Sequence, residues 1–145
     1  MTTATLTEPG LEFQTAVRAQ LIATPAIMGL VSETSIRAGG SRPTAFPCIR
    51  LGNGTTDYLG RSGAQHFARV NLDLHVWAEQ DGSAKDRILA HHVAHAILGL
   101  PVQHPSFYLV EPIPFPSAVW TSHERDGQFY DHGVLEVEAA IGWAA

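Results

Sequence analysis

The stretch 66–78 constrains the fold more than any other part of the chain, because apolar and polar residues alternate along it. A period of two residues is typical of a β-strand that buries one face and leaves the other in water. We therefore expect one long, half-buried strand here. Its expected buried face carries Val70, Leu72, Leu74 and Val76, and its expected exposed face carries Asn71, Asp73 and His75.

A helix is predicted directly after this strand, over 83–98. Ser83 is expected to be its N-cap, with the acidic Asp86 in the first turn, where the helix dipole favours negative charge. Gly99 stands where a helix commonly ends, and Pro101 cannot continue a helix. The expected buried stripe has helical spacing and consists of Ile88, Leu89, Val93, Ala96 and Ile97.

Further helices and strands surround this central unit. Pro9 is expected to begin a first helix that ends near Ala23, because a proline costs little at the first helical position. Pro47 indicates an edge position or a bulge in its strand, and Asp126-Gly127 predicts a hairpin turn. The remaining predictions are a short helical turn over 26–31 and strands over 46–51, 107–110, 118–125 and 129–143.

This order of elements predicts an α+β fold. We expect a single domain with a twisted antiparallel sheet and two main helices packed on one face of it. The length of 145 residues is that of one ordinary domain. Residues 1–8 are expected to form a flexible N-terminus, and residues 9–145 to form the domain.

Charge and hydropathy disfavour two broad classes of protein. The net charge is −5 and no segment clusters Lys or Arg, whereas gripping nucleic acid needs such a cluster to neutralise phosphates. No stretch approaches the roughly 20 apolar residues of a membrane span, so we expect no membrane association. The single cysteine, Cys48, excludes an internal disulfide.

Three histidines on the predicted helix 83–98 raise the possibility of a metal site. His91 and His95 are spaced to share a metal ion, with His92 beside them. Zinc proteases with this spacing carry Glu directly after the first His, where this chain has His92. A third ligand is also needed, and none is clearly aimed at this helix face. A solvated or contact face is therefore favoured over a metal site.

Candidate nucleophiles and carboxylate pairs are also better explained without catalysis. Cys48 follows a proline inside an apolar strand, where a small buried side chain is usual. Gly60-Arg61-Ser62-Gly63 lacks the spacing of a nucleophile elbow, and Gly52-Asn53-Gly54 lacks the lysine and helix start of a phosphate loop. Glu136 and Glu138 share one strand face, which favours a solvated surface. We expect no catalytic, cofactor-binding or metal site.

Two segments have the composition of contact surfaces. The stretch 52–65 is expected to be an extended hairpin tip that exposes Tyr58, Leu59 and Arg61, and Tyr and Arg are enriched in interface cores. The stiff segment Pro112–Pro116 is expected to expose Ile113 and Phe115 on a backbone that loses little entropy on docking. The alternative for both segments is an ordinary surface loop.

The chain resembles the tail-terminator (tail-completion) family of long-tailed phages and gene transfer agents. The resemblance covers roughly residues 11–143 and depends mainly on apolar spacing. It includes the helix and turn of 11–30, broken at Thr24-Pro25, and the last hairpin, Asp126-Gly127-Gln128-Phe129-Tyr130 followed by Gly133-Val134-Leu135-Glu136-Val137. It also includes Phe46-Pro47-Cys48-Ile49-Arg50, which leads into the 68–78 strand with its Val76-Trp77-Ala78 end, and the 83–98 helix. His91, His92, His95 and the Pro112–Pro116 segment are not typical of the family.

The resemblance implies a structural protein without catalytic activity. Members form a six-fold ring on the end of the tail tube, stop its polymerisation and join it to the head-side connector. The implied partners are identical subunits, the tail tube protein and a head-side stopper or connector protein, in a particle assembled in the bacterial cytoplasm. An acidic subunit would let DNA pass through the ring without holding it.

Three alternatives stay open at this point. One is a neck stopper or a tube-like adaptor of the same particle. The second is a small metal-dependent hydrolase that uses His91 and His95. Stoichiometric zinc binding that is lost when both histidines are replaced by alanine would favour this alternative. The third is a free-standing binding module that uses the 52–65 segment, which a lone 1:1 complex with a partner would favour.

Overall fold

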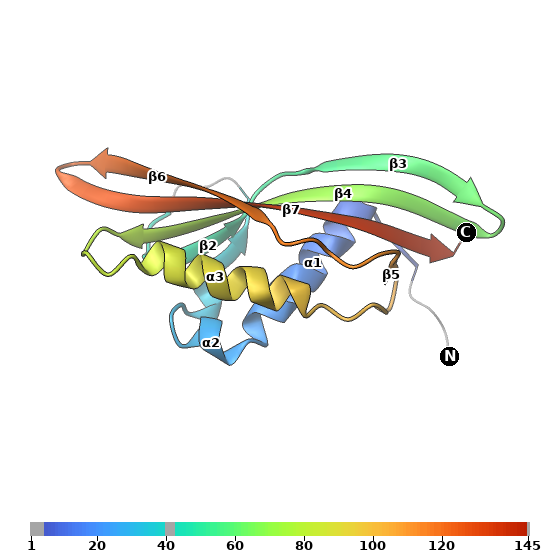
Figure 1. The fold of residues 1–145 in the computed structure, drawn as a ribbon, viewed down its shortest axis with the longest axis horizontal. Coiled ribbons are helices and arrows are strands. Elements are labelled where there is room, and N and C mark those ends of the chain that lie inside the picture. Colours follow the sequence, from blue (N-terminus) through green and yellow to red (C-terminus); the bar gives the residue numbers. More distant parts are fainter. Residues whose placement is uncertain (1–4, 40–42, 145) are drawn as a thin grey trace.

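The structure is a computed structural model that describes residues 5–39 and 43–144. Its centre is a seven-stranded sheet, and the helices lie together on one side of that sheet (Figure 1). This arrangement confirms the predicted α+β fold. The strands are β1 (Ile36–Ala38), β2 (Cys48–Leu51), β3 (Thr55–Ser62), β4 (Gln65–Glu79), β5 (Tyr108–Leu109), β6 (Ser117–Arg125) and β7 (Gln128–Ala144).

Two long strands, β4 and β7, run through the whole sheet. They pair antiparallel without interruption from Gln65 opposite Ala144 to Glu79 opposite Tyr130. Four shorter strands pair with part of a long strand: β2 and β3 pair with β4, whereas β5 and β6 pair with β7. The remaining described strand, β1, pairs with β2. As a result, the β3–β4 hairpin and the β6–β7 hairpin extend toward opposite ends of the molecule (Figure 1).

Three α-helices and one short 3-10 turn complete the fold. They are α1 (Pro9–Ile22), α2 (Pro25–Met28), the 3-10 turn Glu33–Ser35 and α3 (Lys85–Leu98). Pro9 begins α1, as predicted, and the carboxylate of Glu8 accepts hydrogen bonds from the backbone N–H groups of Gly10 and Leu11. These bonds satisfy two donors that the first helical turn leaves without a helical acceptor.

The core lies between the helices and one face of the sheet. On β4 the predicted alternation is confirmed, because Val70, Leu72, Leu74 and Val76 are buried while Asn71, Asp73 and His75 are only half-buried. The apolar residues of α1, α3 and β7 that meet them also follow helical or strand spacing, and they include Phe13, Val17, Leu21, Leu89, Val93, Ile97, Leu135, Val137 and Ile141.

The start of α3 differs from the sequence prediction. Ser83 is not the N-cap: that position belongs to Ala84, which has a left-handed backbone (φ 53°) and no capping side chain. Ser83 instead donates both its N–H and its hydroxyl to Asp81 in the turn before the helix. The buried face of the helix also differs from the prediction, because Ile88 is 47% exposed and Ala90 is buried.

Two predictions about the strands are also wrong. Pro47 does not mark an edge or a bulge, because β2 begins one residue later and has β1 and β4 on its two sides. Much of the 52–65 segment is strand β3, which pairs with β4 and turns tightly at Gly63. One strand pair differs from the predicted antiparallel sheet, since β1 and β2 are parallel.

The predicted flexible N-terminus stays a prediction. Residues 1–4 lie outside the described ranges. Within residues 5–8, Thr7 donates hydrogen bonds to Glu12 and Glu8 caps α1. The boundary of the domain at residue 9 is likewise a prediction.

Candidate functional site

A row of three histidines crosses the sheet face opposite the helices. His75, His132 and His123 come from the neighbouring strands β4, β7 and β6, and we call them the histidine row. The Nδ1 of His75 lies 2.9 Å from the Nε2 of His132, and the Nδ1 of His132 lies 3.2 Å from the Nε2 of His123. Both contacts have hydrogen-bond length.

Aromatic rings surround the histidine row. The indole of Trp77 stacks on the His132 ring, with ring centres 3.8 Å apart and planes 7° from parallel. Phe46 stacks on Tyr130 nearby, at 4.5 Å. Phe46, Trp77, His123 and Tyr130 line a small pocket of about 140 Å³ together with Pro43, Glu124 and Arg125.

The histidine row does not have the geometry of a metal site. His132 uses its two ring nitrogens on opposite sides, one toward each neighbour, so the three rings do not direct one nitrogen each to a common point. No group of three potential ligands suited to a metal ion is found among residues 5–39 and 43–144. Burial lowers the pKa of His132 to about 4, and His75 and His123 add to this shift because neighbouring positive charges repel.

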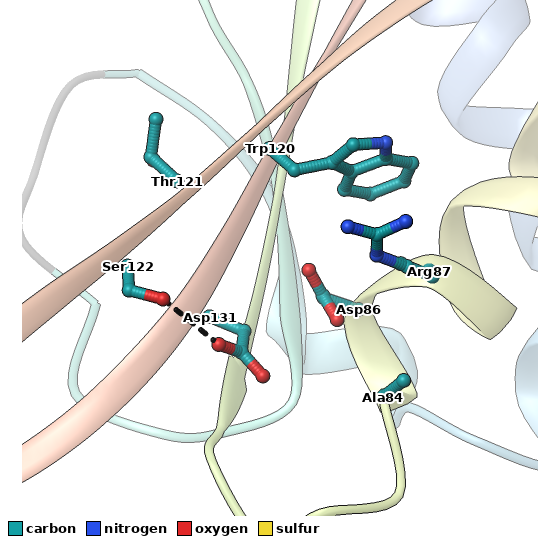
Figure 2. Close-up of a pocket in the computed structure, with 7 residues that line it drawn as sticks. All are labelled: Ala84, Asp86, Arg87, Trp120, Thr121, Ser122 and Asp131. Atoms are coloured by element: carbon teal, nitrogen blue, oxygen red, sulfur yellow. Dashed lines mark hydrogen bonds between the residues drawn. The ribbon is translucent and has the colours of Figure 1, made fainter.

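A second pocket lies on the helix side of the sheet, between the start of α3 and the β6–β7 hairpin (Figure 2). Its volume is about 350 Å³. The guanidinium of Arg87 stands 5.0 Å from the centre of the Trp120 ring, which is a cation–π contact. Ser122 donates a 3.3 Å hydrogen bond to Asp131 on the adjacent strand. The cation–π contact links the hairpin to α3, whereas the Ser122–Asp131 bond lies within the hairpin.

Asp86 is the buried carboxylate of this second pocket. Only 4% of its surface is exposed, and burial raises its pKa above the usual range of an aspartate. A hydrogen bond from the backbone N–H of Arg87 opposes this rise, whereas the charge of Asp131 adds to it. The two carboxylates disfavour each other's ionised form, whereas the charge of Arg87, which also lines the pocket, favours the ionised form of Asp86.

The predicted contact residues of the 52–65 segment lie on β3 and are exposed. Tyr58 and Leu59 have 66% and 56% of their surface exposed, and Arg61 is exposed near the hairpin turn. The ring of Tyr58 meets only the edge of Trp143, at 6.5 Å. A bulge between Tyr58 and Gly60 displaces the strand at Leu59. Their exposure agrees with the prediction, and their contact with a partner stays a proposal.

The Pro112–Pro116 segment agrees with its prediction at one residue and differs at the other. Phe115 is 66% exposed, with an edge contact to His95 of α3 at 5.6 Å. Ile113 is only 8% exposed and belongs to the core, so its predicted exposure is wrong. Ile113 packs in the hydrophobic core, where burial removes its large apolar side chain from water.

The other candidate residues lie on two different elements, the histidines on α3 and Cys48 on β2. His91 and His95 lie exposed on α3, with ring centres 4.4 Å apart, and His92 is half-buried. Cys48 is buried beside Arg50, and burial raises the pKa of its thiol, which makes a thiolate nucleophile unfavourable.

Two further sequence candidates are explained by structure. The carboxylate of Glu138 accepts a 2.7 Å hydrogen bond from Arg69, so it is engaged in an ion pair. Gly54 approaches the backbone of Asn71 so closely that a Cβ would lie 1.6 Å from the Asn71 carbonyl oxygen, which explains a glycine there without a phosphate ligand. Within the described ranges, no helix has both the length and the apolar character that crossing a membrane requires.

The fold of this chain also occurs in a solved structure. A chain of a structure described as the virion of a native gene transfer agent particle has the same fold, with a TM-score of 0.64. It is 18% identical, and the match covers 89% of this chain and 93% of that chain. A second solved structure, at 16% identity and over 91% and 96% of the two chains, has a TM-score of 0.47 and adds no argument. No curated protein matches the sequence.

A family model also matches residues 15–142, which is most of the chain. The match includes the second half of α1, all of α3, and the strands as far as residue 142 of β7, so it covers the sheet that carries the histidine row as well as the two hairpins. The chain therefore belongs to the family of the tail completion protein gp17.

Proposed function

We propose that this protein is a subunit of a six-fold ring that caps the tail tube of a phage or gene transfer agent particle. In this proposal the ring ends tube polymerisation and joins the tail to the head-side connector while DNA passes through it. The match of the tail completion family over residues 15–142 carries the proposal. The fold shared with a chain of a gene transfer agent virion supports it.

The edges of the sheet support a head-to-tail assembly. Among the described residues, β3 pairs only with β4 and β6 pairs only with β7, so each leaves one row of backbone N–H and C=O groups unpaired. Such edges favour association with another chain. Because the two hairpins point to opposite ends of the molecule (Figure 1), one end of a subunit can contact the other end of the next, as a closed ring requires.

Exposed apolar side chains supply further contact area. Tyr58 and Leu59 lie on the β3–β4 hairpin, and Phe115 lies on the segment before β6. Large apolar groups in the open are unfavourable in an isolated subunit, and burial against a neighbour removes them from water. We propose Tyr58, Leu59, Arg61 and Phe115 as partner-contact residues. We assign the protein no catalytic activity and no cofactor.

Native mass spectrometry of the purified protein, with and without the tail tube protein, tests the ring. We expect a species of six subunits in the presence of the tube protein. A lone 1:1 complex would instead support a binding module. Binding to the head-side connector protein without binding to the tube protein would support a neck stopper.

Single substitutions test the contact residues. Tyr58→Ser and Phe115→Ser are expected to leave the circular dichroism spectrum unchanged and to abolish the six-subunit species. Val102→Ser is a matched control, because Val102 is 65% exposed and lies outside both contact segments. Equal loss of the ring in all three variants would contradict the assignment of the contact residues without contradicting the ring itself.

Particles that lack the protein test the role in the tail. Electron microscopy of such particles is expected to show overlong or headless tails. Normal particles would contradict the proposed function.

A further inference from the structure

The histidine row adds side-chain contacts to the backbone ladders of three strands, β4, β7 and β6. It lies on the sheet face opposite the described helices. Its members are half-buried or exposed: His75 and His132 are half-buried, and His123 is exposed. The Thr121 hydroxyl lies 3.4 Å from the Nδ1 of His132 and 3.2 Å from the Nε2 of His123, so it completes the contacts at the β6 end. The row therefore connects the β6–β7 hairpin to the long central strand β4.

The number of protons that the row can hold follows from its connections. A neutral imidazole has one N–H donor and one acceptor nitrogen, whereas an imidazolium has two donors and no acceptor. When all three rings are neutral, His132 donates to one neighbour and accepts from the other, so both contacts are satisfied. One extra proton leaves both contacts satisfied, because a charged His132 can donate to both neighbours, but the burial of that charge already favours the open hairpin.

A second extra proton breaks the row. Whichever two rings are charged, at least one contact then has an N–H facing another N–H, with no acceptor between them. Like charges also repel across ring nitrogens that are 2.9 and 3.2 Å apart. We propose that the histidine row is a proton-sensitive link that holds the edge strand β6 against β7 and β4 at neutral pH and releases it in acid.

The charged groups around the row do not offset this effect. From β2, the cationic Arg50 stands opposite His75 in the sheet register. The next acidic residues on this face are Asp73 on β4 and Glu136 on β7, which stand opposite each other. Glu79 lies at the end of β4, Arg125 at the end of β6, and Tyr130 on β7.

None of these groups neutralises the row. Within residues 5–39 and 43–144, no carboxylate forms an ion pair with His75, His123 or His132. Residues 43–47 are uncharged. The lowered pKa of His132 agrees with a row that stays neutral while the protein is folded.

Release of the row would affect the hairpin specifically. The β6–β7 hairpin extends beyond the sheet centre toward one end of the molecule (Figure 1). On its helix side, the contacts that hold it are those of Trp120 with Arg87 (Figure 2). On its other side, the histidine row provides the side-chain link to β4. The backbone ladder of β4 with β7 continues through this region as far as Glu79 and Tyr130, so opening in acid is expected in the edge strand β6, and not in β7 or the β3–β4 hairpin.

Amide hydrogen exchange of the purified protein between pH 7.5 and pH 5 tests this proposal, with exchange rates corrected for their intrinsic pH dependence. With a pKa of about 4 for His132 when closed and about 6.5 when open, the opening equilibrium of β6 rises about 30-fold at pH 5. We expect that loss of protection in Ser117–Arg125. Protection in Thr55–Ser62 serves as an internal reference and is expected to stay constant.

Variants separate the row from general acid effects. His132→Gln removes the central ring, and we expect its β6 protection to be lower at pH 7.5 but independent of pH down to 5. His123→Gln removes one contact at an exposed position and replaces His132→Gln as the test variant if the latter does not fold. In His123→Gln, the pH dependence of β6 protection is expected to be at most half that of the wild type. His91→Gln makes the same change on α3, away from the row, and is expected to behave as the wild type.

Two results would overturn the proposal. One is a wild-type β6 strand that keeps its protection at pH 5. The other is a pH-dependent loss of β6 protection that is as large in both His123→Gln and His132→Gln as in His91→Gln. These measurements use the isolated subunit, so they do not depend on the proposed ring.

Discussion

Substitution of Gly133 by alanine tests how the β6–β7 hairpin is attached to the helix layer. A Cβ at Gly133 would lie 2.5 Å from Cζ3 and 2.8 Å from Cε3 of Trp120. Carbon atoms in favourable contact are about 3.5–4.0 Å apart, so the indole must move by about 1 Å. The ring cannot simply lift away, because the Arg87 guanidinium stands 5.0 Å from the ring centre.

The expected cost follows from three contributions. Alanine in a strand is favoured over glycine by roughly 0.5–1 kcal/mol. Overpacking of this kind costs about 1–3 kcal/mol, and a weakened cation–π contact costs about 0.5–1 kcal/mol. The clash therefore outweighs the backbone gain, and we expect the free energy of unfolding to fall by about 1–2 kcal/mol. The melting temperature would fall by roughly 2–8 °C in a domain of this size.

Urea denaturation followed by circular dichroism measures this cost, and a double-mutant cycle identifies its cause. In the Trp120→Ala background the clash is absent, so Gly133→Ala should cost little or should stabilise the protein, with a coupling energy of at least about 1 kcal/mol. Gly29→Ala is the control, because a Cβ there has its nearest contact at an ordinary 3.5 Å. Equal effects at Gly29 and Gly133, or an unchanged cost without Trp120, would refute the reasoning.

Two further predictions concern carboxylates with shifted pKa values. Burial disfavours ionisation of Glu8, but hydrogen bonds from Leu11, Gly10 and Thr56 outweigh it and lower the pKa. Glu8→Ala should therefore lower the free energy of unfolding by about 1 kcal/mol at neutral pH. Urea denaturation should show the stability difference between variant and wild type shrinking as the pH falls below the usual pKa range of a glutamate. Asp86 has the opposite sign, because its raised pKa means that the folded state favours the neutral acid and that this stabilisation is lost as pH rises. Asp86→Asn should therefore stabilise the protein at pH 7 and lose its advantage below about pH 4, and a variant less stable at pH 7 than the wild type would contradict this account.

The fold was predictable where one periodicity dominates. The alternation in 66–78 and the Asp126-Gly127 turn identify β4 and the β6–β7 hairpin because each depends on neighbouring residues alone. One error was local, because the side chain of Ser83 bonds to Asp81 instead of capping α3. Another arose where neighbours in space decide: β3 is a strand in spite of Gly60 because β4 supplies its hydrogen-bond partners.

The histidine row was not predictable for the same reason. His75 and His132 are far apart in the chain, and their contact depends on the register of β4 against β7. A one-residue shift of that register would move every side chain of a strand to the other face. The sequence does carry a partial signal, since His123 and His132 flank the predicted turn at distances that bring them close in a hairpin. Ile113 shows the converse limit, because no local pattern distinguishes it from the exposed Phe115.

The uninterrupted pairing of β4 with β7 has a mechanical consequence. In an antiparallel pair the hydrogen bonds lie perpendicular to the strands, so tension applied along the strand axis loads many bonds in shear at the same moment. The pairs from Gln65–Ala144 to Glu79–Tyr130 would share such a load. The short partners β5 and β2 would carry far less of it. A molecule pulled from its two ends should therefore shed its periphery first and keep this central pair until last.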